Sequence, residues 1–223
     1  MTDGQIGVIF DCDGTLLDSM GVWRELESEL AQRAGVVLSR EDTDLITTLT
    51  IPEVGELFHD RFGLGESVAD VVRMIDEFMM TYYRERSSAR PGALAFVQSL
   101  ADRGVPTSVA SSTPPTLLKA GLAHCGFAPY LAAIVSVEDV GRSKREPAVY
   151  DRAREALGTT RTQTWVFEDS VYAVHTAHAA GYPTVGMYDC DLGGTYEQLS
   201  LAADRAFHSF EELDADAFLG WTE

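Results

Sequence analysis

The sequence predicts a doubly wound α/β fold, in which a parallel sheet carries helices on both faces. Short runs of β-branched and apolar residues alternate with helical stretches, and the intervals after the second run are long enough for crossover helices. The runs are continuous rather than strictly alternating, which is typical of strands buried on both sides. A long helical interval between the first two runs indicates an inserted module.

The expected strands cover residues 6–10, 107–110, 133–137, 164–167, 183–187 and 205–207. Within the insertion, apolar residues recur at helical spacing over 22–34 and 68–86, and Ser39 is expected to open a further helix. Tyr82 and Tyr83 are expected in the core of this module, and so is Trp23, for which a place facing the cleft is the alternative because it follows the hinge closely. Residues 1–19 and 91–223 are therefore predicted as the α/β core, and residues 20–90 as a helical domain.

The composition narrows the function classes. The chain has 223 residues and a net charge of −18, with 17 basic and 35 acidic side chains. This balance disfavours nucleic acid and anionic membranes as partners, because both bind through basic patches. No apolar run approaches the ~18 residues that a membrane span needs, and the N-terminus does not resemble a signal peptide. We expect a cytoplasmic protein, a monomer or weak homodimer.

Three widely spaced cysteines argue against a disulfide framework and against a zinc knuckle. Cys12 lies between two aspartates, whose charges would disfavour a thiolate. Its side chain is also expected on the opposite face of the strand from those aspartates. We therefore interpret Cys12 as a packing residue rather than a nucleophile.

The first strand delivers Asp11 and Asp13 into a Gly14-Thr15 turn. Side chains at i and i+2 of a strand share a face, so both carboxylates can point at one site. The turn is expected to leave backbone N–H groups for an anion. A calcium loop is disfavoured, because Val22 stands where the acid at the twelfth position belongs.

Three further segments are expected at the same edge of the sheet, where ligands bind in open α/β folds. They are Ser111-Ser112-Thr113 after the second strand, Lys144 before a helix, and Glu168-Asp169 after the fourth strand. Taken singly, each has an ordinary structural interpretation as a helix cap, a solvated lysine or a helix-dipole acid. Together, a hydroxyl, an ammonium and several carboxylates indicate metal-assisted phosphoryl transfer. His175 and His178 lack a third ligand, so a surface or packing role is favoured.

These four segments resemble the motifs of the haloacid dehalogenase superfamily, in its Asp-x-Asp-Gly-Thr phosphatase branch. The resemblance rests on Phe-Asp-Cys-Asp-Gly-Thr-Leu-Leu-Asp-Ser, on the hydroxyls after the second strand, on Lys144, and on Val-Phe-Glu-Asp-Ser followed by Ala-Ala-Gly. It implies a Rossmann-like core. The insertion resembles the helical cap of the β-phosphoglucomutase-like subgroup.

The resemblance also implies roles for single residues. Asp11 would attack phosphorus and form an aspartyl-phosphate, while Asp13 would act as the general acid and base. Ser111 and Lys144 would stabilise the phosphoryl group. The implied Mg²⁺ ligands are Asp11, Asp13 through its backbone carbonyl, and Asp169, with Glu168 either as a further ligand or as a residue that holds a ligand in place. The expected phosphate contacts are Gly14, Thr15 and Ser112.

The third motif departs from the usual Lys-Pro-x-Pro-Asp, because Ala148 stands at the aspartate position. Arg142 lies close to Lys144 in sequence, so either residue could supply the charge of this motif.

Asp13 favours ester hydrolysis over carbon–halogen hydrolysis, since an alkoxide leaving group needs an acid. Residues 20–90 contain no lysine for a phosphonatase Schiff base. A sugar-phosphate mutase remains the main rival, although residues 49–53 carry no basic side chain for a second phosphate. A catalytically silent binding relative is the third alternative. We predict a hydrolase of a small phosphomonoester, such as a sugar phosphate, a nucleotide or a similar metabolite.

Overall fold

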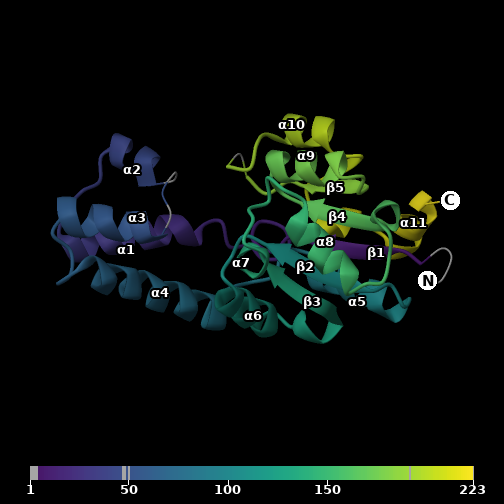
Figure 1. Ribbon diagram of the computed structural model, residues 1–223, viewed down its shortest axis with the longest axis horizontal. Coiled ribbons are helices and arrows are strands. Elements are labelled where there is room, and N and C mark those ends of the chain that lie inside the picture. Colours follow the sequence, from purple (N-terminus) through teal and green to yellow (C-terminus); the bar gives the residue numbers. More distant parts are fainter. Residues whose placement is uncertain (1–4, 47–48, 50, 191, 223) are drawn as a thin grey trace. The chain divides into compact units, whose positions relative to one another are not determined.

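The computed structural model describes residues 5–46, 49, 51–190 and 192–222 (Figure 1). The chain forms two compact units: a core unit of Met1–Ser19 and Ser87–Glu223, and a helical unit of Met20–Arg86. Among the described helices, none combines the length and the apolar character that crossing a membrane requires.

The core unit contains a six-stranded parallel sheet in the order β3-β2-β1-β4-β5-β6. The strands are β1 Gly7–Phe10, β2 Thr107–Ser111, β3 Leu131–Ser136, β4 Thr164–Glu168, β5 Thr184–Met187 and β6 Arg205–Phe207. The predicted doubly wound fold is confirmed. In the register of the sheet, Val8 of β1 pairs with Thr107 of β2 on one side and with Trp165 of β4 on the other. Strands β1, β2 and β4 therefore end at one edge, beside each other.

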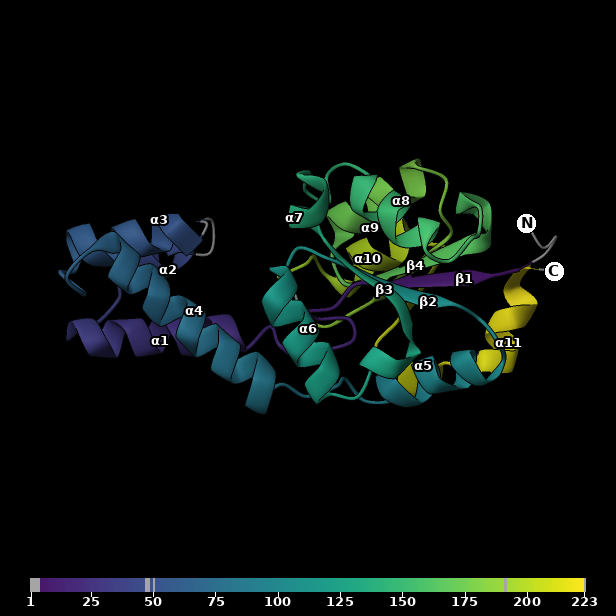
Figure 2. The same ribbon diagram turned by 60° about the horizontal axis from the view of Figure 1, so that its bottom comes forward.

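Helices cover both faces of this sheet, with α8, α9 and α10 on one face and α5, α6 and α11 on the other (Figure 2). The helices of the core unit are α5 Ala93–Asp102, α6 Pro115–His124, α7 Val137–Val140, α8 Ala148–Glu155, α9 Val171–Ala179, α10 Tyr196–Ala202 and α11 Ala215–Leu219. Short 3₁₀ turns cover Ala128–Tyr130, Arg161–Gln163, Phe210–Glu212 and Gly220–Thr222.

Successive side chains of β1 point to opposite faces of the sheet and pack in different clusters. Ile9 packs in one cluster with Val166 of β4 and with α8, whereas Phe10 contacts Phe96 and Phe167 on the other face. Because the side-chain period of a strand is two, Asp11 leaves β1 on the Ile9 face and Cys12 on the Phe10 face. Cys12 is fully buried, as expected of a packing residue.

The helical unit contains α1 Val22–Ala34, α2 Arg40–Ile46, α3 Ile51–Glu56, a π-helix over Leu57–Arg61, and α4 Val68–Glu85. Ser67 caps α4 by accepting a hydrogen bond from the Asp70 N–H, and a left-handed Gly35 ends α1. Tyr82 and Tyr83 are buried as expected. The expectation of a buried Trp23 is wrong, since 36% of this residue is exposed.

The boundary between the units differs from the expected one, because residues 87–90 pack with the core unit. The Asp18 N–H donates to the Ser88 carbonyl, and the Arg90 N–H donates to the Leu16 carbonyl. The Arg90 guanidinium also donates to the carbonyls of Tyr188 and His208. These long-range bonds attach the segment to loops of the core unit, and local sequence pattern does not predict them.

Candidate active site

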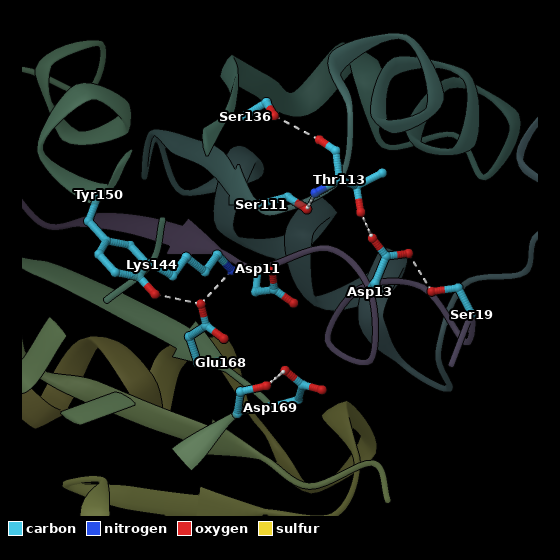
Figure 3. A network of polar contacts seen from close by, with 11 residues as sticks. Asp11, Asp13, Ser19, Ser111, Thr113, Ser136, Lys144, Tyr150, Glu168 and Asp169 are labelled. Atoms are coloured by element: carbon cyan, nitrogen blue, oxygen red, sulfur yellow. Dashed lines mark hydrogen bonds and ion pairs between the residues drawn. The ribbon is translucent and has the colours of Figure 1, made fainter. Parts of the chain in front are cut away.

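Polar side chains from four segments meet where β1, β2 and β4 end (Figure 3). Asp11 follows β1, Ser111 ends β2, and Glu168 ends β4. Lys144 reaches the same place from the loop between α7 and α8, and it contacts both Asp11 and Glu168. The parallel register of the strands thus brings together residues that lie far apart in the sequence.

Lys144 is buried between two carboxylates. Its Nζ donates to Asp11 Oδ1 and, at 2.6 Å, to Glu168 Oε1. Burial alone would lower the pKa of Lys144, but the charges of Asp11 and Glu168 outweigh burial and raise it. The ammonium therefore stays charged. Arg142 instead pairs with Glu146 at the surface, so the structure places Lys144 at the site, despite Ala148.

Asp11, Glu168 and Asp169 form a carboxylate cluster, whose members offer oxygen atoms within 4.8 Å of one another. All three side chains are buried. Burial is the main cause that raises the pKa of Asp11; Lys144 opposes it, and the charges of Glu168 and Asp169 add to it. Burial and the charge of Glu168 raise the pKa of Asp169 to about 7.

The donor set of this carboxylate cluster fits Mg²⁺. Three buried carboxylates face one ammonium, so negative charge is in excess at a place that water hardly reaches. Carboxylate oxygens are the ligands that Mg²⁺ prefers, and few protein ligands suffice because the ion keeps several waters. A divalent cation would balance the charge that Lys144 leaves uncompensated.

Asp13 lies apart from this cluster, although it is only two residues from Asp11 (Figure 3). The hydroxyl of Ser19 donates to Asp13 Oδ1 at 2.5 Å, and the hydroxyl of Thr113 donates to Asp13 Oδ2 at 2.5 Å. The Asp13 side chain is thus held by neutral donors and is not one of the clustered carboxylates. This arrangement leaves only the backbone carbonyl of Asp13 for the metal role expected of the residue.

The turn after β1 is tight and is closed by its own backbone hydrogen bonds. Gly14 adopts a positive φ of 81°, its N–H donates to the Leu17 carbonyl, and the Thr15 N–H donates to the Cys12 carbonyl. The turn therefore uses the N–H groups of Gly14 and Thr15 internally, and the phosphate contacts expected of these two residues stay predictions. The buried Thr15 hydroxyl has no hydrogen-bond partner within the described residues.

The three hydroxyls after β2 have different surroundings. Ser111 is buried and its Oγ accepts the Thr113 N–H at 3.0 Å. Thr113 is fixed further by its carbonyl, which accepts the Ser136 hydroxyl at 2.8 Å. Ser112 is exposed and hydrogen-bonds to Tyr172. Ser111 and Thr113 thus supply the inward hydroxyls of this segment, and Ser112 lies on its outer side.

The structure adds three residues that sequence reasoning did not assign to the site: Ser19, Thr113 and Tyr150. Tyr150 of α8 is buried and its hydroxyl donates to Glu168 Oε1 at 2.7 Å. Burial and the charge of Glu168 raise the pKa of this tyrosine well above its usual range. Ser19 ends the first motif and Thr113 follows Ser111, so proximity to the motifs was the available signal for both. For Tyr150, the sequence indicated only a place in a helix and nothing that pointed to the site.

Cys12 and the two histidines of α9 take no part in this network. Burial raises the pKa of the Cys12 thiol, and the charges of Asp13 and Asp11 raise it further, so a thiolate is disfavoured. His178 lies 3.5 Å from Asp204 at the surface. Within the described chain, the carboxylate cluster is the one group of three suited to a metal.

A family model for haloacid dehalogenase-like hydrolases matches residues 7–181, which include all four motif segments. The chain belongs to this family. The resemblance inferred from the motifs is therefore confirmed. The match begins in β1 and extends beyond α9, so it covers the candidate active-site residues of this haloacid dehalogenase-like hydrolase.

Individual relatives of this hydrolase cover most of its length. A phosphoglycolate phosphatase of Rhodospirillum rubrum is 31% identical over 92% of this chain and 88% of its own. Hexitol phosphatase B of Escherichia coli is 29% identical over 96% of this chain and 97% of its own. CbbY from Rhodobacter sphaeroides, solved in complex with phosphate, has a TM-score of 0.77 and 24% identity, covering 97% and 99% of the two chains. The similarity to CbbY shows the shared fold.

Proposed function

We propose that this hydrolase is a Mg²⁺-dependent phosphatase, which releases phosphate from a small phosphomonoester through an aspartyl-phosphate. The observation that carries the proposal is the contrast between two neighbouring aspartates at one sheet edge. Asp11 belongs to the buried carboxylate cluster with Lys144, while Asp13 is held beside it by hydroxyl groups. A nucleophile and a separate proton carrier are what ester hydrolysis needs.

In the first step, an Asp11 oxygen attacks phosphorus and the bond from phosphorus to the ester oxygen breaks. Asp13 gives its proton to the leaving oxygen, so the alcohol departs neutral. In the second step, Asp13 takes a proton from water, and the oxygen of that water attacks phosphorus. The bond to Asp11 breaks, phosphate leaves, and both aspartates return to their starting state.

Other side chains would stabilise the charge that develops on the phosphoryl oxygens. Lys144 supplies a fixed positive charge against Asp11, and Ser111 supplies an inward hydroxyl. Asp11, Glu168 and Asp169 would hold Mg²⁺, with the backbone carbonyl of Asp13 as a further ligand. The bound ion would act as a Lewis acid that offsets phosphoryl charge.

The relatives support small phosphate esters as substrates, because their names specify phosphoglycolate and hexitol phosphates. We propose that the helical unit acts as a cap that selects the substrate and excludes bulk water. A cytoplasmic location and a monomer or weak homodimer stay predictions from the sequence.

A sugar-phosphate mutase is the second candidate, since it would use the same pair of aspartates. It must also bind a second phosphate, and the stretch 49–53 offers no basic side chain for one. This composition favours release of phosphate to water over its transfer to a second sugar position.

The test is a panel of sugar phosphates, nucleotides and small phosphorylated acids, assayed for phosphate release with Mg²⁺ and again with a chelator. We expect release from a subset of esters, loss on chelation, and recovery when Mg²⁺ is restored. Conversion of β-glucose 1-phosphate to glucose 6-phosphate without phosphate release would establish the mutase instead. No turnover of any ester would favour the silent binding relative.

A further inference from the structure

Tyr150 is a buried polar residue that the proposed chemistry does not use. It lies in α8, and its side chain is fully buried in the cluster that joins α8 to β1, β2 and β4. A phenol in such a place needs a partner for its hydroxyl. The partner is Glu168, a member of the carboxylate cluster.

One oxygen of Glu168 receives two donors. Oε1 accepts the Tyr150 hydroxyl at 2.7 Å and the Lys144 ammonium at 2.6 Å. The second oxygen points away from both donors (Figure 3). Two donors on one oxygen fix the rotation of the carboxylate, and they leave the other oxygen for a ligand.

Lys144 alone does not specify this orientation, because its ammonium is shared with Asp11. A lysine ammonium is a point charge on a flexible four-carbon stem, and it imposes little direction on a carboxylate. The Tyr150 hydroxyl, in contrast, extends from a rigid ring. It also adds no charge to the pairing of Lys144 with the carboxylates.

Packing fixes the Tyr150 ring itself. The Tyr182 ring lies against it, with centroids 6.3 Å apart at 57°, and Lys144 Nζ lies 5.9 Å from its centroid. Val149 and Ala153 of the same helix are buried in the same cluster. The phenol oxygen therefore has a defined position relative to β4, which carries Glu168.

We propose that Tyr150 is a positioning residue for the metal site: its hydroxyl holds one oxygen of Glu168, so that the other faces Asp11 and Asp169. This inference rests on the proposed function for its metal, and it concerns a residue that touches neither substrate nor ion. Partners that orient metal ligands are commonly worth about 10–100-fold in metal affinity.

The test compares Tyr150→Phe with Tyr182→Phe in the full chain. Each substitution removes one buried hydroxyl that donates to a carboxylate, and the acceptor of Tyr182 is Asp151, outside the carboxylate cluster. The readout is the Mg²⁺ concentration that gives half of the maximal rise in melting temperature, measured without substrate. We expect about a tenfold increase for Tyr150→Phe and no change for Tyr182→Phe.

A double-mutant cycle tests whether the effect acts through Glu168. In a Glu168→Gln background, Tyr150→Phe should change the Mg²⁺ midpoint far less than in the wild type. Equal effects of Tyr150→Phe in both backgrounds would overturn the proposal, as would equal midpoints for Tyr150→Phe and wild type. Tyr150→Met, whose flexible side chain can fill the same apolar space, serves if Tyr150→Phe does not fold.

The outcomes separate this inference from the proposed function. A shifted Mg²⁺ midpoint in a protein that hydrolyses no ester would support the positioning role and refute the phosphatase. Phosphate release by the wild type with an unmoved midpoint in Tyr150→Phe would refute the positioning role alone. A wild type that Mg²⁺ does not stabilise would overturn both the positioning role and the metal requirement.

Discussion

Asp11 and Asp13 are two residues apart, yet they have opposite kinds of partner. Asp11 is buried against the Lys144 ammonium and two further carboxylates. Asp13 is partly exposed and accepts hydrogen bonds from two hydroxyls, those of Ser19 and Thr113. The difference arises because Asp11 follows β1 directly, whereas Asp13 lies in the turn beyond it.

The partners suit different chemical tasks. An ammonium can only donate, so Lys144 favours the carboxylate form of Asp11, which the proposed attack on phosphorus requires. A hydroxyl can rotate to donate or to accept, so Ser19 and Thr113 can follow a change in the protonation of Asp13. Two carboxylates in unlike surroundings are the usual arrangement for separate nucleophile and acid roles.

The largest expected effect comes from Asp11→Asn. The amide cannot attack phosphorus, so Mg²⁺-dependent phosphate release should fall at least about 10⁴-fold, as is usual for loss of a nucleophile. Asp151→Asn is the control, because Asp151 is another aspartate with two hydrogen-bond partners and lies outside the carboxylate cluster. Steady-state phosphate release measures both variants. Undiminished release by purified Asp11→Asn protein would remove the mechanism.

Asp13→Asn should cost less, about 10²–10⁴-fold, as expected for loss of a general acid and base. Its effect should also depend on the leaving group. With 4-nitrophenyl phosphate, whose leaving group needs no proton, Asp11 can still be phosphorylated, but activation of water is impaired. We therefore expect a burst of nitrophenol equal to the enzyme concentration, followed by slow turnover. A slow phase without a burst would show that the two aspartates do not divide the steps in this way.

The sequence predicted the Asp11 side of the site better than the Asp13 side. Asp11, Glu168 and Lys144 follow from strand ends and motif spacing, because a parallel sheet brings its carboxyl ends together. The donors to Asp13 depend on side-chain rotamers and on the path of a turn, which spacing does not encode. Tyr150 was missed for the same reason. A helix was expected after Lys144, but the direction of a hydroxyl on that helix depends on side-chain rotamers, which spacing does not encode.

In the helical unit, too, the sequence predicted some features and missed others. Helices α1 and α4 follow from amphipathic spacing and from clear ends, Gly35 and Ser67. The π-helix at Leu57–Arg61 was not predicted, since an extra residue in a helical turn has no marker in apolar periodicity. The exposure of Trp23 was missed because local pattern does not say which aromatic residues lie outside the core.

In the metal-free protein, the carboxylate cluster should lower the free energy of unfolding. A folded-state pKa of about 7 for Asp169, against 3.8 as its ordinary value, means that the folded protein binds a proton more readily than the unfolded chain. Stability is therefore lost as pH rises from about 4 to 7, by about 4 kcal/mol at most. Asp169→Asn should thus stabilise the chelated protein at pH 8 and leave it unchanged near pH 4.

Asp151→Asn should behave in the opposite sense. Burial would raise the pKa of Asp151, but Arg161 and Tyr182 lower it below its ordinary value. The Asp151 carboxylate therefore stabilises the folded protein at pH values above its ordinary pKa, and this stabilisation is lost as pH falls. Asp151→Asn should thus be less stable than the wild type at pH 8. Thermal unfolding from pH 4 to 8, with chelator and with Mg²⁺, measures both variants. Destabilisation of chelated Asp169→Asn at pH 8 would show that the cluster carries no excess charge.

The smallest expected effect comes from the hydroxyls that hold Asp13. Ser19→Ala and Thr113→Val each remove one hydrogen bond to this carboxylate, and each should lower kcat about 3- to 10-fold, a fraction of the 1.5–3 kcal/mol typical of bonds to charged groups. KM should change little, because neither hydroxyl belongs to the carboxylate cluster or to its Lys144 pairing. Ser99→Ala is the control, since its hydroxyl donates to a carbonyl within α5. Because both hydroxyls act on Asp13, their effects should vanish in an Asp13→Asn background, whereas hydroxyls that bind phosphate directly would still matter there.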